Sequence, residues 1–238
     1  MKVGTDGTLL GAWAPVEHVQ NGSVLDVGTG SGLIALMIAQ RCPEASVLAI
    51  DSDEAAARQA AENFACSPWP TRLRAEHLSL QELAENGSFA HSFRLIVSNP
   101  PYFTDSLKNP DAGRRAARHN DSLSFAELLD GCSRLLREDG TLALILPAEE
   151  EECILSLAAA HDLTPYKITR VHTRAHKPAK RVMLALANKN NGGPSKSPLL
   201  GGLDNRELNR TNTLILQDES GTPRSAAYQS LCGDFYLN

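Results

Sequence analysis

The 238-residue chain is predicted to fold as an α/β protein. We expect a mostly parallel sheet of seven strands, with helices on both faces and an antiparallel closing strand. Three observations favour this class. Short apolar strands alternate with helix-favouring stretches, a glycine-rich turn follows the first strand, and the intervening stretches are long enough to form the crossovers that parallel strands require.

The first half of the chain contains four strands separated by helical stretches. The stretch that begins at Asp53 is rich in alanine and glutamate, which have high helix propensity, whereas the strands are short and rich in Val, Leu and Ile. The predicted order is strand 23–27, helix 33–41, strand 46–50, helix 53–66, strand 73–80, helix 81–85 and strand 93–98.

The second half begins with a capping box. Ser124-Phe-Ala-Glu127 predicts a helix start, and Asp139-Gly140 predicts its end. The next predicted elements are strand 141–146, helix 149–161 and strands 166–173 and 181–187. A last strand at 213–216 and the terminal Phe235-Tyr236-Leu237 are expected to pack back on the body. Residues 188–212, rich in Gly, Pro, Ser and Asn, predict a mobile loop within one domain of residues 1–238.

Composition narrows the class of protein. A net charge of −5 argues against a wholly basic nucleic-acid binder, although a local basic patch can still bind RNA. The five cysteines are widely spaced without a Cys-x-x-Cys pair, so we expect neither a metal site nor a disulfide framework. No signal peptide and no membrane-length apolar run are visible, which predicts a cytoplasmic protein without membrane contact.

The turn Asp26-Val-Gly28-Thr-Gly30-Ser-Gly32 lies between the first strand and the first helix. Glycines permit tight turning and close approach to a ligand, and helix N-termini present N–H groups. Asp51 follows Gly30 by 21 residues, the position of a ribose-binding acid. The spacing is G-x-G-x-G rather than the G-x-G-x-x-G of dinucleotide folds. A nucleotide-type cofactor is therefore predicted; a tight strand–helix junction alone is the alternative.

A second turn, Ser98-Asn99-Pro100-Pro101-Tyr102, follows the fourth strand. Two prolines fix φ and remove two N–H donors, so this turn is stiff and rich in acceptors. The Asn99 side chain, two backbone carbonyls and the Tyr102 ring suit a planar amine that donates two hydrogens and stacks. The alternative is a bend that merely ends the strand, with Asn99 bonded to its own backbone.

Together these turns resemble class I S-adenosylmethionine-dependent methyltransferases, which have a Rossmann-like fold. The first turn is similar to their motif I, in which the acid and glycines hold the amino acid portion of S-adenosylmethionine and the later acid holds the ribose. The resemblance assigns those contacts to Asp26, Gly28, Gly30, Gly32 and Asp51. Asn99-Pro100-Pro101-Tyr102 is similar to motif IV of amino-methyltransferases acting on adenine N6, guanine N2 or glutamine amides, which makes these four residues the catalytic candidates.

The segment Met1-Lys-Val-Gly-Thr-Asp-Gly-Thr-Leu-Leu-Gly-Ala-Trp13 resembles the start of the bacterial tRNA1(Val) (adenine-37-N6)-methyltransferase family. Ser67-Pro-Trp69 and Asp234-Phe-Tyr-Leu237 also match. The resemblance implies adenine-N6 methylation of tRNA at position 37, with Thr5, Asp6 and Leu9 at the methionine end of the cofactor. Family members usually carry a further segment before this motif, so residues 1–22 are expected to be a truncated N-terminal lid.

One expected cofactor contact departs from the family pattern. The family has an acid near the adenine of the cofactor, and that position aligns with Ser79. A serine hydroxyl can still form a hydrogen bond there, but a weaker one than a carboxylate forms.

Basic residues support tRNA as the partner of an enzyme that we expect to be a monomer. Phosphate contacts of this kind weaken with salt. The candidates are Arg114, Arg115, Arg118, Lys167, Arg170, Arg174, Lys177, Lys180 and Arg181. Solvated hairpin and helix surfaces are the alternative interpretation of these residues.

Three other functions stay open. A protein-glutamine methyltransferase is expected to carry an additional N-terminal helical domain. A ribosomal guanine-N2 methyltransferase is expected to show Asn-Pro-Pro-Phe and a duplicated domain. A non-catalytic RNA-binding or cofactor-sensing module is the third alternative.

Overall fold

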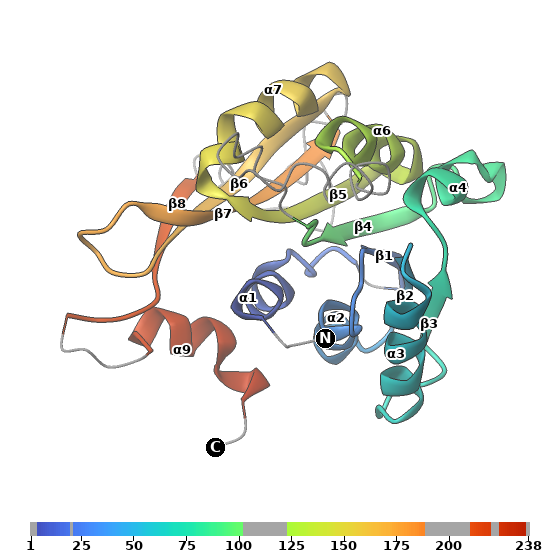
Figure 1. Ribbon diagram of the computed structural model, residues 1–238, viewed down its shortest axis with the longest axis horizontal. Helices are drawn as coiled ribbons and strands as arrows, with labels where there is room; N and C mark the ends of the chain where they lie inside the picture. Colours follow the sequence, from blue (N-terminus) through green and yellow to red (C-terminus); the bar gives the residue numbers. More distant parts are fainter. Residues whose placement is uncertain (1–3, 20, 102–122, 189–209, 220–223, 237–238) are drawn as a thin grey trace, which may run out of the picture.

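The computed structural model describes residues 4–19, 21–101, 123–188, 210–219 and 224–236. These residues form one sheet with helices on both faces, so the predicted fold class is confirmed (Figure 1). The strands are β1 (Ser23–Val27), β2 (Ser46–Asp51), β3 (Leu73–His77), β4 (Phe93–Ser98), β5 (Leu136–Pro147), β6 (Leu163–His172), β7 (Ala179–Asn188) and β8 (Arg210–Ile215).

The described sheet has eight strands in the order β3-β2-β1-β4-β5-β7-β6-β8. The first five in this order pair in parallel, so their carboxyl ends lie along one edge. β7 is antiparallel to both β5 and β6, as expected of the closing strand. β8 extends the predicted seven strands by one, because it pairs in parallel with β6 at the sheet edge.

Helices cover both faces of the sheet. One face carries α1 (Thr5–Trp13), α2 (Leu33–Arg41), α3 (Glu54–Ala65) and α9 (Ala226–Cys232), and the other carries α4 (Leu80–Glu85), α6 (Phe125–Leu135) and α7 (Glu151–Ala160) (Figure 1). Short 3-10 turns are η1 (Gly87–Phe89), η2 (Ala148–Glu150) and η6 (Gly233–Phe235). Because strand side chains alternate between faces, Val24 packs in one apolar cluster and Leu25 in the other.

Several boundaries differ from the sequence prediction, among them the starts of β6 at Leu163 rather than residue 166 and of β7 at Ala179 rather than residue 181. β3 ends at His77 rather than at residue 80, because Ser79 caps α4. α6 ends at Leu135, and Leu136 already pairs with Phe93, so residues 139 and 140 lie inside β5. Of the predicted loop 188–212, residues 210–212 belong to β8, and residues 189–209 lie outside the described residues.

Helix α1 occupies the segment predicted to be a lid. Gly7 to Trp13 are buried, and Trp13 Nε1 donates a hydrogen bond to Thr169 Oγ1 on β6 at 3.0 Å. The ammonium of Lys167 donates to the Trp13 carbonyl at 3.2 Å and lies 4.4 Å from the centroid of its ring. These contacts fix α1 to the sheet beside α2.

None of the helices in the described part of the chain has the length and apolar character needed to span a bilayer.

The Trp13–Thr169 hydrogen bond allows a test of how α1 is anchored. Trp13→Phe and Thr169→Val should each lower the free energy of unfolding, and the double variant should lose less than the sum of the two. We expect a coupling free energy of about 1 kcal/mol, the net value of a buried hydrogen bond. Denaturant titration of the four proteins measures it, and strictly additive losses would show that this bond does not anchor α1.

Candidate functional site

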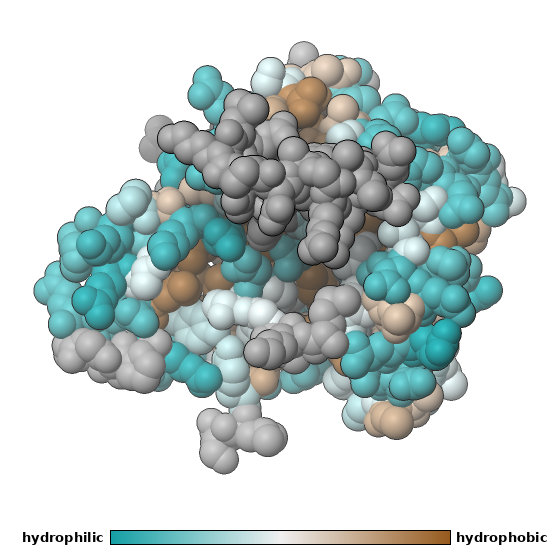
Figure 2. All heavy atoms as spheres, viewed as in Figure 1, coloured by the Kyte–Doolittle hydropathy of each residue, from teal (hydrophilic) through white to brown (hydrophobic). Residues whose placement is uncertain are grey.

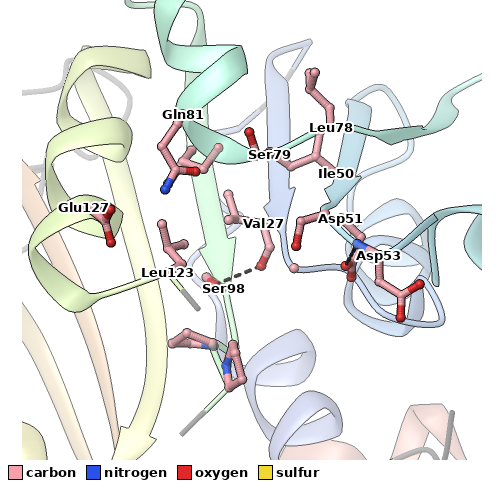
Figure 3. Close-up of a pocket in the computed structure, with 15 residues that line it drawn as sticks. Val27, Ile50, Asp51, Asp53, Leu78, Ser79, Gln81, Ser98, Leu123 and Glu127 are labelled. Carbon is pink, nitrogen blue, oxygen red and sulfur yellow. Dashed lines mark hydrogen bonds between the residues drawn. The ribbon is translucent and has the colours of Figure 1, made fainter. Parts of the chain in front are cut away.

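The carboxyl ends of β1, β2 and β4 open into a cavity of about 670 Å³. Figure 3 shows its lining side chains, with Asp51 and Asp53 on one side and Gln81, Leu123 and Glu127 on the other. The cavity is lined by Val27, Gly28, Ile50, Asp51, Ser52, Asp53, Leu78, Ser79, Leu80, Gln81, Ser98, Pro100, Pro101, Leu123 and Glu127.

The glycine-rich turn after β1 docks on the end of β2. The N–H groups of Gly28 and Thr29 both donate to the Ile50 carbonyl, at 2.9 and 3.0 Å. The Gly30 N–H donates to Asp51 Oδ2 at 2.9 Å. The N–H groups expected to face a ligand at these three positions are therefore held by β2, and what the turn offers to the cavity is the bare backbone of Gly28.

Gly28, Gly30 and Gly32 all have positive φ angles, and the surroundings of two of them show why glycine is required there. Gly28 has φ +69° and open space where a Cβ would lie, so the chain can approach a ligand closely there. Gly32 has φ +81°, and a Cβ there would lie 2.5 Å from the ring of Phe64. Gly32 therefore lets α2 and α3 pack together, while Gly28 leaves the cavity floor open.

Asp26 lies beneath the turn and is fully buried. Its Oδ2 accepts hydrogen bonds from Thr29 Oγ1 at 2.6 Å and from the Ala35 N–H at 3.2 Å, which ties the turn to the first turn of α2. Its Oδ1 is buried without a hydrogen-bond partner in the described structure. Burial raises the pKa of Asp26 to about 7, against the opposing hydrogen bonds from Thr29 and Ala35.

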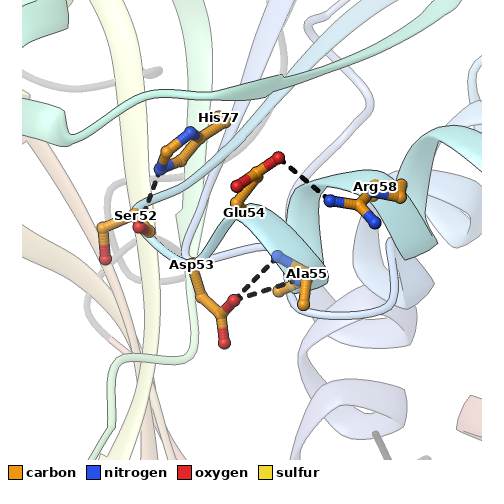
Figure 4. Close-up of polar contacts among 7 residues, drawn as sticks. Ser52, Asp53, Glu54, Ala55, Arg58 and His77 are labelled. Carbon is orange, nitrogen blue, oxygen red and sulfur yellow. Dashed lines mark hydrogen bonds and ion pairs between the residues drawn. The ribbon is translucent and has the colours of Figure 1, made fainter.

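The residues after β2 are held by short-range bonds (Figure 4). The Asp53 carboxylate caps α3 by accepting from the N–H groups of Ala55 and Ala56. His77 Nε2 lies 3.1 Å from the Ser52 carbonyl, and the Asp53 N–H donates to Asp51 Oδ1 at 3.0 Å. These bonds fix Asp51 at the cavity wall.

The second predicted turn ends β4 at the same cavity. Ser98 is buried, and its hydroxyl donates to the Val27 carbonyl at 2.9 Å, which locks the ends of β4 and β1 together (Figure 3). Asn99 is half-buried, and Pro100 and Pro101 line the cavity. Tyr102, the remaining catalytic candidate, lies outside the described residues.

Sequence reasoning missed the polar residues that α4 and α6 bring to the cavity. Gln81 lies in the first turn of α4 and Glu127 in the first turn of α6, and both line the cavity. The signal that could have found them was the Ser-x-x-Glu capping box, which places a helix start. Ser79 was predicted and does line the cavity.

The predicted cofactor residues of α1 lie at the same edge of the sheet but do not line this cavity. Leu9 is fully buried in the core. Asp6 accepts a hydrogen bond from Arg181 Nε at 2.8 Å, and Arg181 pairs with Pro147 at the carboxyl end of β5. Of the predicted glycines, Gly28 lines the cavity, and Gly30 and Gly32 are buried behind it.

Three of the predicted RNA-binding residues are half-buried and have partners within the protein, and a fourth, the exposed Arg174, donates from Nε to Gln217 Oε1 at 3.3 Å. Arg170 makes two hydrogen bonds to the Glu151 carboxylate, at 2.8 and 2.6 Å. Lys167 bonds to α1, where burial lowers its pKa, and Arg181 bonds to Asp6.

The other predicted RNA-binding residues fall into two groups. Arg174, Lys177 and Lys180 are exposed at the tip of the β6–β7 hairpin. This tip, at the left of Figure 1, lies in a hydrophilic region of the surface in Figure 2. The remaining three, Arg114, Arg115 and Arg118, lie outside the described residues.

Comparison with solved structures supports the fold. A predicted O-methyltransferase from Agrobacterium tumefaciens superposes with a TM-score of 0.70 over 98% of both chains, at 16% sequence identity. A ribosomal protein L11 methylase from Lactobacillus delbrueckii superposes with a TM-score of 0.54 over 77% of both chains, at 22% identity. At these identities the likeness concerns the fold alone.

Comparison of sequences is more specific. Residues 8–152 match the methyltransferase small domain. A tRNA1(Val) (adenine(37)-N6)-methyltransferase of Bacteroides fragilis is 48% identical over 78% of this chain and 76% of its own length. One of Parabacteroides distasonis is 43% identical over 92% of this chain and 90% of its own length. The chain belongs to the tRNA1(Val) (adenine(37)-N6)-methyltransferase family.

Proposed function

We propose that this chain transfers a methyl group from S-adenosylmethionine to N6 of adenosine 37 in tRNA1(Val). The observation that carries the proposal is the Asn99-Pro100-Pro101 turn at the mouth of the cavity, in a chain 43–48% identical to relatives of that name. The identity of those relatives favours adenine over guanine or a glutamine amide.

The residues of the cavity fit the cofactor. Its volume of about 670 Å³ suits a nucleoside-sized ligand. Asp51 would accept hydrogen bonds from ribose hydroxyls. The exposed backbone of Gly28 would allow the amino acid portion of the cofactor to lie close to the turn. Asp26 lies behind this lining, and its unpartnered Oδ1 would be satisfied by a cationic amine that enters beside the turn. Bound S-adenosylmethionine supplies a methyl group activated by a positively charged sulfur.

The Asn99 turn would act by orienting the acceptor amine. The lone pair of an adenine amino group is delocalised into the ring, which makes the nitrogen a poor nucleophile. The Asn99 side-chain oxygen and the Pro100 carbonyl would accept its two hydrogens and favour a pyramidal nitrogen whose lone pair points at the methyl group. Because both prolines fix φ and the Ser98–Val27 bond holds the strand end, the acceptors are preorganised.

The hairpin residues Arg174, Lys177 and Lys180 would contact the phosphates of the tRNA. They are exposed at the tip of the β6–β7 hairpin, and the start of β7 pairs with the carboxyl end of β5, at the edge of the sheet where the cavity opens. In this proposal Lys167, Arg170 and Arg181 have structural roles, because each is half-buried and bonds to a partner in the protein, whereas Arg174 is exposed.

The reaction is tested with labelled S-adenosylmethionine and tRNA from a strain that lacks the modification. We expect label in N6-methyladenosine at position 37 after nuclease digestion. Asn99→Ala should reduce the rate by about 10²-fold or more, because it removes an oriented polar contact in the transition state, and should leave cofactor affinity almost unchanged. Asn86→Ala, the same change outside the cavity lining, is the control. Label in guanosine or protein would contradict the proposal.

Cofactor affinity should depend on pH through Asp26. Its pKa of about 7 in the free protein reflects burial of the carboxylate, and a cationic amine beside Oδ1 would favour the ionised form. Below pH 7 Asp26 of the free protein carries a proton, which binding must release. Affinity for S-adenosylhomocysteine should therefore fall by up to about tenfold for each unit by which the pH is lowered. Calorimetry between pH 5.5 and 8.5 measures this, and Asp26→Asn should flatten the profile. A flat profile for the unmodified protein would exclude this role.

Binding of tRNA should depend on the charge of the hairpin. Replacing Lys177 and Lys180 with alanine should weaken affinity and lower the slope of log affinity against log salt by about two, because each lysine would neutralise one phosphate. Arg58→Ala with Arg74→Ala removes the same charge from exposed residues on α3 and β3, at the opposite edge of the sheet, and serves as the control. Equal weakening in both double variants would argue against binding of tRNA by the hairpin.

A further inference from the structure

Two polar side chains face the cavity from the helices on its far side. Gln81 and Glu127 lie opposite Asp51 and Asp53 (Figure 3). The cavity lining also includes the apolar side chains of Ile50, Leu78, Leu80 and Leu123. If Asp51 holds the ribose, as the proposed function requires, a base attached to that sugar enters the apolar part and meets the polar groups of α4 and α6.

The hydroxyl of Ser79 is already engaged by its own helix. It donates to Glu82 Oε2 at 2.6 Å and accepts from the Glu82 N–H at 3.2 Å, so the proton and a lone pair serve the cap of α4. The Ser79 N–H also donates to Glu82 Oε2, at 2.9 Å. Recognition of a base by polar side chains on this side therefore passes to Gln81 and Glu127.

Glu127 and Gln81 lie on the same side of the cavity (Figure 3). Glu127 Oε2 accepts from the hydroxyl and the N–H of Ser124, at 2.6 and 2.8 Å, in the cap of α6. These bonds lower the pKa of Glu127, the hydroxyl first, and the nearby Gln81 amide lowers it further. Because a carboxylate accepts hydrogen bonds only, its charge favours the rotation of the Gln81 amide in which the NH₂ group faces Glu127 and the carbonyl oxygen faces away.

We propose that Gln81, oriented by Glu127, recognises the adenine ring of the cofactor. An oriented glutamine amide matches adenine, because its oxygen accepts from the 6-amino group while its second N–H donates to the neighbouring ring nitrogen. Gln81 is the base-binding residue and Glu127 is a positioning residue. The inference deepens the proposed function and rests on its assignment of the cofactor.

The role of Glu127 leads to a specific consequence for selectivity. Hypoxanthine presents the reverse pattern to adenine, with an acceptor at position 6 and a donor at N1. An unrestrained glutamine could bind it after rotating its amide by half a turn. With Glu127 in place, that rotation would point the amide oxygen at a carboxylate. The wild-type protein should therefore reject the inosine analogue, and the rejection should depend on the charge of Glu127.

The test compares the affinities of S-adenosylhomocysteine and S-inosylhomocysteine by calorimetry. We expect the unmodified protein to prefer the adenosine compound by about tenfold or more, the discrimination of one bidentate contact. Glu127→Gln should bring the ratio close to one, chiefly by improving binding of the inosine compound. Gln81→Ala should also bring it close to one, by weakening binding of the adenosine compound.

Glu82→Gln is the matched control. Glu82 and Glu127 are both the glutamate at helix position N3 of a Ser-x-x-Glu capping box, and hydrogen bonds from the cap serine lower the pKa of both carboxylates. Of these two glutamates, Glu127 alone lines the cavity. Thermal melting should shift alike for the two variants, and Glu82→Gln should keep the wild-type ratio.

Two results would overturn the inference alone: an unchanged ratio in Glu127→Gln or Gln81→Ala, or equal loss of discrimination in Glu82→Gln. A wild-type protein that binds neither compound would overturn the cofactor assignment as well.

Discussion

The site depends on the attachment of the glycine-rich turn to the end of β2. The Ile50 carbonyl accepts two N–H groups of the turn, and Asp51 accepts a third. On its other side the turn is tied to α2 through Asp26. Asp51 therefore holds the turn against β2, and Asp26 holds it against α2. Both ends of the turn are fixed relative to the edge of the sheet. The cavity takes its shape from this attachment.

Hydrogen bonds also hold the neighbouring strands and helices where they end or start at this edge. Ser98 closes β4 onto β1, and Asp53 caps α3. Capping boxes start α4 and α6 at Ser79 and Ser124. When the strand ends and helix starts around a cavity are already hydrogen-bonded, the cavity can keep its shape without a ligand. Positioning an amine for reaction requires this preorganisation.

Local chemistry explains how much could be predicted from the sequence. The turns at Gly28 and Asn99 were predictable because glycine and proline impose their geometry on the chain wherever they lie. The Ser124 capping box was predictable because the side chains of its serine and glutamate bond to backbone N–H groups within the same turn. The capping boxes place Gln81 and Glu127 in first helical turns, but their position in the cavity was not predictable, because it depends on where the fold places the two helices relative to the strand ends.

Long-range contacts explain the remaining differences. The basic residues between 164 and 183 read as one RNA-binding cluster, yet Lys167 bonds a residue 154 positions away and Arg181 one 175 positions away. These pairings arise from the fold, which places β6 beside α1 and the start of β7 beside the carboxyl end of β5. The order of these basic residues in the sequence therefore could not show which side chains bond within the protein and which are exposed.

The central claim is that one cavity holds the cofactor with its sulfur directed at the Asn99 turn. A crystal structure with S-adenosylhomocysteine tests it most directly. We expect the ribose hydroxyls on Asp51, the purine between the apolar side chains beside Gln81, and the sulfur at the side where Pro100 and Pro101 line the cavity. A ligand bound in the reverse direction, with its purine at Asn99, would contradict the claim.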